Sequence, residues 1–350
     1  MISLSDRATP LPLQCSIDWV CKYVSNGFCR VRAGASMNAI QLRNVTKVFG
    51  SVAAVSDLSL SIPEGSIYGF IGPNGSGKTT TMRMIVGILH PDGGSIQLMG
   101  KEVKGVPIGR IGYLPEERGL YRKMRLRALL EFHGSLRGGL NVSAEVTEWL
   151  QRLGLAEWAD KPVEALSKGM SQKAQFIAAV LCRPPIVILD EPFSGLDPVA
   201  AESLREAILE LRQRGTTVVL STHDMPTAEA MCEFIFMIFR GKKVLDGSLA
   251  DIQELYSSDI IRFSISNDSS RAGHDLGEVP GVEQVRDLGR VQELRLAHGS
   301  DPQLVLRELV SRTQLISFAL AKPSLHDIFL RIAGPASADP SETKSESNVA

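Results

Sequence analysis

Residues 72–79 read GPNGSGKT, which fits the pattern G-x-x-x-x-G-K-[S/T]. The apolar run SIYGFIG at 66–72 precedes this loop and predicts a strand, and TTTMRMIVGIL at 79–89 follows it with a helical pattern. Glycines let the backbone fold tightly, so that successive N–H groups point at one anion, and the helix adds the positive end of its dipole. The sequence therefore predicts a phosphate-binding loop and a chain that binds a nucleoside triphosphate.

Two side chains of this loop have distinct expected roles. Lys78 supplies a mobile positive charge between the β- and γ-phosphates, and the hydroxyl of Thr79 can ligate Mg²⁺. The residues expected to contact the nucleotide are Gly72, Pro73, Asn74, Gly75, Ser76, Gly77, Lys78, Thr79 and Thr80.

The stretch PIVILDE at 185–191 predicts the second part of the same site. Its apolar residues form a buried strand that delivers Asp190 at its carboxyl end, where α/β sheets hold their ligands. Asp190 is expected to help hold Mg²⁺. Glu191, the next residue, is expected to polarise the attacking water as a general base.

Composition excludes several other classes of function. The 350 residues carry 38 Lys and Arg against 39 Asp and Glu, so no global positive field recruits nucleic acid, and we expect no nucleic-acid partner. No apolar run approaches the ~20 residues that cross a bilayer, so any membrane role requires a partner that supplies the spans. The odd count of 5 Cys argues against a disulfide scaffold and favours the reducing cytosol.

Strand-like and helical patterns alternate along most of the chain, which predicts an α/β domain with a largely parallel sheet. We expect this nucleotide-binding domain at 37–250 and a smaller α/β unit at 251–334, where IIRFSIS and VQELRLA read as strands and DPQLVLRELVSR as a helix. Residues 1–36 are expected to be a disordered or non-native extension before Met37. The polar residues 335–350 are expected to form a disordered tail.

Three further motifs, in order along the chain, resemble those of the nucleotide-binding subunit of an ABC transporter. LSKGMSQ at 166–172 lies where that family has its LSGGQ signature, SGLD at 194–197 looks like its D-loop, and STHD at 221–224 resembles its switch-histidine segment. The resemblance implies a P-loop NTPase ABC cassette with a helical subdomain at about 117–182, plus a small C-terminal α/β domain. It also implies ATP and Mg²⁺ as cofactors.

The same resemblance implies roles for residues outside the phosphate loop. His223 would contact the γ-phosphate, and Phe49 would stack on adenine. Two copies would pair head to tail, so that Ser167 and the backbone N–H of Gly169 reach the γ-phosphate of the partner and Asp197 meets the opposing subunit. Lys168 and Met170 depart from LSGGQ, and the side chain of Lys168 needs a place that the family pattern does not provide.

A final departure concerns IGYLPEERGLY at 111–121. Glu116 lies 38 residues after Lys78 (116 minus 78), where the family has a glutamine that reaches Mg²⁺ and the attacking water. A carboxylate can also ligate Mg²⁺, because this hard cation prefers oxygen. We therefore expect Glu116 to be a metal and water contact, and Glu117 to be a solvated neighbour.

The C-terminal part narrows the class of ABC protein. RGKKVLDGSLADIQELY at 240–256 and KPSLHDIFLRIAG at 322–334 resemble a subgroup of cassettes that serve exporters with a separate permease, including sodium-extruding systems. We expect an ATPase subunit that binds such a permease at the cytoplasmic face of the membrane and exports an ion, drug or lipid. The alternative is a soluble ABC ATPase that acts on a cytosolic partner. For the C-terminal unit we favour dimer stabilisation over ligand binding.

Overall fold

The computed structural model describes residues 38–103, 110–117, 119–139, 142–256, 260–265, 279–297 and 299–337. The chain divides into two units, Met1–Ser36 and Met37–Ala350, and all of these residues belong to the second. The extension predicted at 1–36 lies outside the described residues, as does most of the predicted tail. In the part that is described, no helix is long and apolar enough to cross a membrane.

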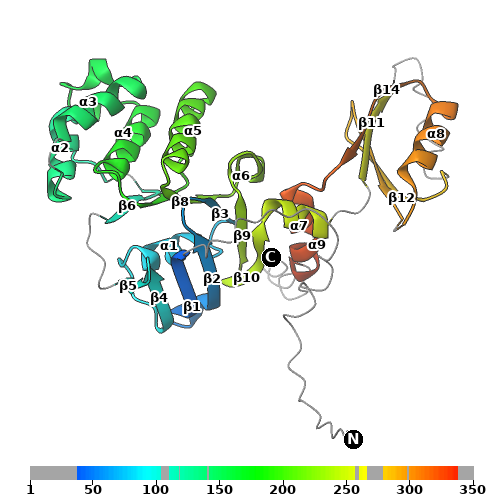
Figure 1. Cartoon of the computed structure of the whole chain (residues 1–350), viewed down its shortest axis with the longest axis horizontal. Helices are drawn as coiled ribbons and strands as arrows, with labels where there is room; N and C mark the ends of the chain where they lie inside the picture. The colour runs from blue at the N-terminus through cyan, green and yellow to red at the C-terminus, as the bar shows by residue number, and fades with distance from the viewer. Residues whose placement is uncertain are drawn as a thin grey trace, which may run out of the picture. The chain divides into compact units, whose positions relative to one another are not determined.

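A six-stranded sheet carries the phosphate-binding loop at one edge. Its order is β10-β9-β3-β8-β7-β6, and all neighbouring pairs are parallel except β9 with β10 (Figure 1). Every residue of β3, β7 and β8 is buried, as expected of strands covered on both faces. The strands are β3 (Ile67–Ile71), β6 (Ile111–Leu114), β7 (Ile186–Asp190), β8 (Thr217–Thr222), β9 (Phe234–Phe239) and β10 (Lys242–Ser248).

An antiparallel sheet of four strands packs against this central sheet. Its order is β2-β1-β4-β5, and its apolar side chains form one core cluster with Tyr68, Phe70, Phe236 and helix α1 (Lys78–Ile85). Strand β1, which the alternating pattern of residues 37–50 predicts, pairs with both β2 and β4. The strands are β1 (Asn38–Phe49), β2 (Val52–Pro63), β4 (Gly93–Leu98) and β5 (Lys101–Glu102).

Helices cover the other side of the central sheet through a second, larger core cluster. Within it, the ring of Trp149 from α3 meets that of Phe176 from α4 edge to face at 5.8 Å. The helices are α2 (Leu126–Leu136), α3 (Val142–Arg152), α4 (Lys168–Val180), α5 (Pro198–Gln213) and α6 (Met225–Met231), with 3-10 turns at Ala156–Trp158 and Val163–Ala165. Both turns and helices α2 to α4 lie in or beside the segment predicted to be a helical subdomain.

The C-terminal residues form an antiparallel sheet with its own core, in the order β12-β13-β11-β14. The last helix, α9 (Leu325–Ser337), instead packs into the core of the helical layer, where Leu325 and Ile328 are fully buried. It continues three residues into the segment predicted as a tail at 335–350. The remaining elements are α7 (Leu249–Leu255), β11 (Ile260–Ile265), β12 (Val282–Asp287), β13 (Gln292–Leu296), α8 (Pro302–Arg312) and β14 (Leu315–Ala321).

Candidate nucleotide-binding site

The phosphate-binding loop connects β3 to α1 and fits tightly against two other strands. A Cβ atom on Gly77 would lie 2.5 Å from the backbone oxygen of Ala54, and one on Gly72 would lie 2.2 Å from that of Ile238. Gly77 also has φ of 108°, a conformation that residues with side chains rarely adopt. The glycines at these two positions are therefore required by the packing of the loop as well as by its curvature.

Lys78 is folded back over this loop. Its Nζ donates to the carbonyl oxygens of Gly72 at 2.6 Å and Pro73 at 3.1 Å, and the residue is only 6% exposed. Burial lowers the pKa of Lys78, and the negative charges of Glu191, Asp190 and Glu116 oppose that shift. Three carboxylates thus surround one ammonium group, so the site has excess negative charge and suits a cation in addition to phosphate.

Asp190 and Glu191 end β7 beside the last residues of β8. The hydroxyl of Ser221 donates to Oδ1 of Asp190 at 2.5 Å and accepts from the backbone N–H of Glu191 at 2.9 Å. Glu191 has φ of 49°, so the chain turns sharply after the strand in a conformation that costs a non-glycine residue on the order of 1–3 kcal/mol. Such strain at the end of a buried strand is typical of functional sites.

The side chain of Glu191 meets the histidine of the STHD motif. Nδ1 of His223 lies 2.9 Å from Oε1 of Glu191. Because an ionised carboxylate can only accept, Nδ1 of His223 is the donor in this hydrogen bond. The glutamate is 10% exposed and the histidine 61% exposed, so the histidine closes one side of the glutamate and faces solvent on the other.

Lys78, Glu116 and Glu191 line one pocket of about 290 Å³. Two buried polar atoms here, Oγ of Ser76 and Oδ2 of Asp190, have no hydrogen-bond partner among the described residues. Buried polar atoms are normally satisfied, so this pair indicates a site built for a polar ligand. The pocket is lined by Ala54, Asn74, Gly75, Ser76, Gly77, Lys78, Thr79, Thr80, Glu116 and Glu191.

The lining of this pocket does not include eight residues named from the sequence, which are Phe49, Gly72, Pro73, Ser167, Gly169, Asp190, Asp197 and His223. Phe49 is 49% exposed at the end of β1, and the ammonium of Lys47 lies 5.5 Å from its ring centroid. Ser167 and Asp197 are N-caps: Ser167 accepts from the backbone N–H of Met170 at the start of α4, and Asp197 from those of Val199 and Ala200 at the start of α5. Gly169 lies in the first turn of α4.

The structure also shows where the unusual Lys168 places its side chain. A Cβ atom on Gly195 would lie 2.6 Å from Nζ of Lys168, so the lysine lies directly over the SGLD loop. Gly195 has φ of 71°, which favours glycine independently of this contact. The lysine is thus accommodated by a neighbour that has no side chain.

Sequence reasoning missed Ser221. It is fully buried and bonds to Asp190, the last residue of β7, and to Glu191, from which it is 30 residues away along the chain. The sequence did contain a signal for this role. Ser221 is a small hydroxyl residue near the end of a buried strand, two positions before His223. Its contact with Asp190 depends on the parallel register of β7 and β8, which pairs Asp190 with Ser221.

We predict that Ser221→Ala lowers the rate of nucleoside triphosphate hydrolysis more than it lowers nucleotide affinity. The change leaves the N–H of Glu191 and an oxygen of Asp190 unsatisfied, at about 1–3 kcal/mol for each buried group, but does not touch the phosphate loop. Steady-state hydrolysis and nucleotide titration measure the two effects. Ser203→Ala, on the exposed side of α5, is the matched control. Unaltered hydrolysis by Ser221→Ala would contradict this role.

Comparison with known proteins identifies the family. Residues 55–194 match the family model described as ABC transporter, and residues 247–333 match that of the ATP-binding protein DrrA1-3-like, C-terminal domain. The chain is 39% identical over 305 residues to the ABC transporter ATP-binding protein YhaQ of Bacillus subtilis, covering 84% of this chain and 98% of that protein. It is 30% identical over 325 residues to the daunorubicin/doxorubicin resistance ATP-binding protein DrrA of Streptomyces peucetius, covering 89% and 98%.

A solved structure agrees with these relatives. The ATP-binding subunit of an ABC transporter superposes with a TM-score of 0.58 at 28% identity, covering 62% of this chain and 93% of that chain. The chain therefore belongs to the ATP-binding subunits of ABC transporters, which bind and hydrolyse ATP to power a separate membrane permease.

Proposed function

We propose that this chain hydrolyses ATP at the pocket around Lys78 and thereby powers an exporter. The observation that carries the proposal is the contact of 2.9 Å between Glu191 and His223, beside a phosphate loop that supplies an ammonium and a helix N-terminus. In this proposal Glu191 is the general base, His223 orients it, and the phosphate loop binds the anion. Those are the groups that attack of water on a γ-phosphate requires.

Mg²⁺ fits the donor set of the pocket. Oδ2 of Asp190 is buried without a hydrogen-bond partner among the described residues, and carboxylate and hydroxyl oxygens suit this hard cation. Thr79, Glu116 and Asp190 would hold it. When bound, Mg²⁺ neutralises charge that develops on the phosphate oxygens.

The protein groups have separate tasks in this reaction. The backbone N–H groups of residues 72–80 and the ammonium of Lys78 bind and orient the triphosphate. Glu191 accepts a proton from the attacking water, and His223 fixes the orientation of the glutamate through Nδ1 while its other side remains open to the γ-phosphate. The hydrogen bond from the backbone N–H of Glu191 to Ser221 holds the base in place before the substrate arrives.

A second copy of the chain would complete the site. Ser167, Gly169 and Asp197 lie at the N-terminal ends of α4 and α5, outside the pocket of their own chain, so they are available to the nucleotide of a partner. A helix N-terminus favours an anion such as the γ-phosphate. We propose a head-to-tail homodimer, in which Phe49 supplies the exposed aromatic surface for adenine.

Export is supported by the names of the relatives. They include the resistance protein DrrA and the Nod factor export ATP-binding protein I of Sinorhizobium fredii, which is 33% identical over 304 residues, covering 85% of this chain and 86% of that protein. We propose that the chain binds an integral membrane permease at the cytoplasmic face. The cargo is selected by that permease. Action of a soluble ATPase on a cytosolic partner is the competing function.

We predict that Glu191→Gln lowers the rate of ATP hydrolysis by about 10²- to 10⁴-fold, because an amide cannot accept the proton of the attacking water. ATP affinity should be retained, since the phosphate loop is unchanged. Size-exclusion chromatography in ATP should then show a stable dimer. Steady-state turnover with the permease present and equilibrium nucleotide binding give the two values, and undiminished turnover would refute the assignment of the base.

We predict that Glu116→Gln shifts the Mg²⁺ dependence of hydrolysis to higher Mg²⁺ concentration, by about 5-fold. The substitution removes one negative charge from an exposed position in the pocket, where a charge pair is worth about 1 kcal/mol. Glu117→Gln is the matched control, because this neighbour is 89% exposed and lies 3.8 Å from Arg83 instead. Superimposable Mg²⁺ curves for wild type and Glu116→Gln would remove the metal role.

We predict that the chain, tagged and purified from detergent-solubilised membranes of its native cell, brings an integral membrane protein with it. In vesicles, that complex should hydrolyse ATP faster than the chain alone, because permease contacts stabilise the competent dimer. Mass spectrometry of the eluate and turnover assays provide the measurements. Recovery of the chain only from the soluble fraction, with a cytosolic partner, would favour the competing function.

A further inference from the structure

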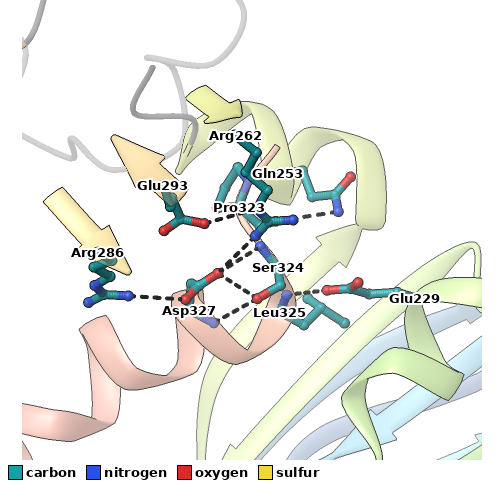
Figure 2. Close-up of polar contacts among 9 residues, drawn as sticks. All are labelled: Glu229, Gln253, Arg262, Arg286, Glu293, Pro323, Ser324, Leu325 and Asp327. Atoms are coloured by element: carbon teal, nitrogen blue, oxygen red, sulfur yellow. Dashed lines mark hydrogen bonds and ion pairs between the residues drawn. The ribbon is translucent and has the colours of Figure 1, made fainter. Parts of the chain in front are cut away.

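Helix α9 begins with a group of hydrogen bonds between Ser324 and Asp327, drawn in Figure 2. Oγ of Ser324 accepts from the backbone N–H of Asp327 at 3.1 Å, and it donates to Oδ2 of Asp327 at 2.6 Å. The same carboxylate oxygen accepts from the N–H of Ser324 at 3.3 Å. This reciprocal arrangement is a capping box, and it leaves the N–H of Leu325 to find a partner elsewhere.

That partner comes from the cassette. Oε1 of Glu229, on α6, accepts a hydrogen bond from the backbone N–H of Leu325 (Figure 2). The carboxylate is well placed electrostatically, because the N-terminus of a helix attracts negative charge. Leu325 and Ile328 are fully buried in the same core cluster as Ala228 and Met231 of α6, so apolar packing surrounds this polar contact.

The C-terminal sheet holds the same turn of α9 from the other side. Arg286 and Arg262 lie 3.5 Å and 3.9 Å from the carboxylate of Asp327, and Nε of Arg262 also donates to Glu293 at 2.9 Å. The register pairs Glu293 with both arginines, so these three residues form a charged row across β12, β13 and β11. Burial opposes the ionisation of Asp327, but the hydrogen bonds from Ser324 and the two guanidinium groups outweigh it and lower its pKa.

Helix α6 connects this turn to the phosphate site. The helix spans Met225–Met231, and its N-cap residue Asp224 directly follows His223. At 1.5 Å per residue, Glu229 lies about 6 Å along the helix from Met225. Glu229, near the C-terminal end of α6, and His223, just before its N-cap, are thus joined through one short helix, and His223 makes the contact of 2.9 Å to Glu191.

We propose that Glu229 is a positioning residue, and that the C-terminal sheet sets the position of the switch histidine through α9 and α6. The inference rests on the role proposed for His223 in hydrolysis. The turn Ser324–Asp327 is the joint: Arg262 and Arg286 fix it to the sheet, and Glu229 fixes it to the cassette. A change at this joint alters the rate of hydrolysis and leaves the phosphate loop, which it does not contact, unaffected.

The test uses the full-length chain and measures kcat, KM and nucleotide affinity for Glu229→Ala. We expect kcat to fall on the order of 10- to 100-fold, the range that a small misplacement of a catalytic group produces, with nucleotide affinity unchanged. Glu229→Gln keeps an acceptor oxygen for Leu325 and should recover most of the rate. Glu202→Ala is the matched control, because this exposed glutamate bonds only to Arg205 in its own helix among the contacts described.

Two further measurements separate positioning from a general loss of stability. Turnover of the Glu229→Ala, His223→Ala double variant should equal that of His223→Ala alone, because Glu229 acts through the histidine. Asp327→Asn, which leaves the cassette intact, should lower kcat in the same direction as Glu229→Ala. Multiplicative losses in the double variant, or wild-type kcat in both Glu229→Ala and Asp327→Asn, would overturn the proposal.

A readout without turnover distinguishes this proposal from the proposed function. In protein whose histidines are labelled for NMR, the ring resonances of His223 should differ between wild type and Glu229→Ala. Glu229→Gln should restore the wild-type positions. Unshifted resonances would overturn the joint even if hydrolysis is confirmed. If the resonances shift but His223→Ala hydrolyses ATP at the wild-type rate, the joint stands and the proposed role of the histidine in catalysis fails.

Discussion

The parallel register of β3, β7 and β8 is the constraint on which the nucleotide site depends. It places Asp190 beside Ser221 and Ile71 beside Thr222, so the phosphate loop, the paired acidic residues and His223 all follow strands that end at one edge of the sheet. All three strands are buried throughout, and a slip of one residue would turn every side chain to the opposite face. Core packing therefore fixes the geometry of the chemistry.

Burial of charge gives this edge its chemical character. Lys78, Asp190 and Glu191 are each less than a tenth exposed, and removing such groups from water is costly unless each finds partners. The loop carbonyls satisfy Lys78, and Ser221 satisfies one oxygen of Asp190. Oδ2 of Asp190 and Oγ of Ser76 remain without a partner in the described chain. A nucleotide with its metal would satisfy what the protein leaves open, which couples ligand binding to the stability of this edge.

The parts of the molecule that could be predicted from sequence are those with local signals. The phosphate loop, Asp190 and Glu191 are encoded by short patterns that include the preceding strand, and the structure brings Glu116 into the same pocket, as expected. The contact of Ser221 with Asp190 could not be predicted, because it depends on the register between two strands. Strands β11 and β13 and helix α8 were foreseen as elements of the C-terminal part. The return of α9 to the cassette core was not, because it depends on contacts between residues far apart in the sequence.

Under the proposal, that return lets the C-terminal sheet affect hydrolysis, although none of its described residues lines the phosphate pocket. A helix of seven residues such as α6 is not stable alone, so its position is determined by the packing of Met225, Ala228 and Met231 in the core. The same core cluster contains Leu325 and Ile328 of α9, whose first turn is held by charges of a separate sheet. The placement of His223 therefore depends on both the cassette and the C-terminal sheet. In this way the C-terminal sheet can act on hydrolysis without contacting ATP.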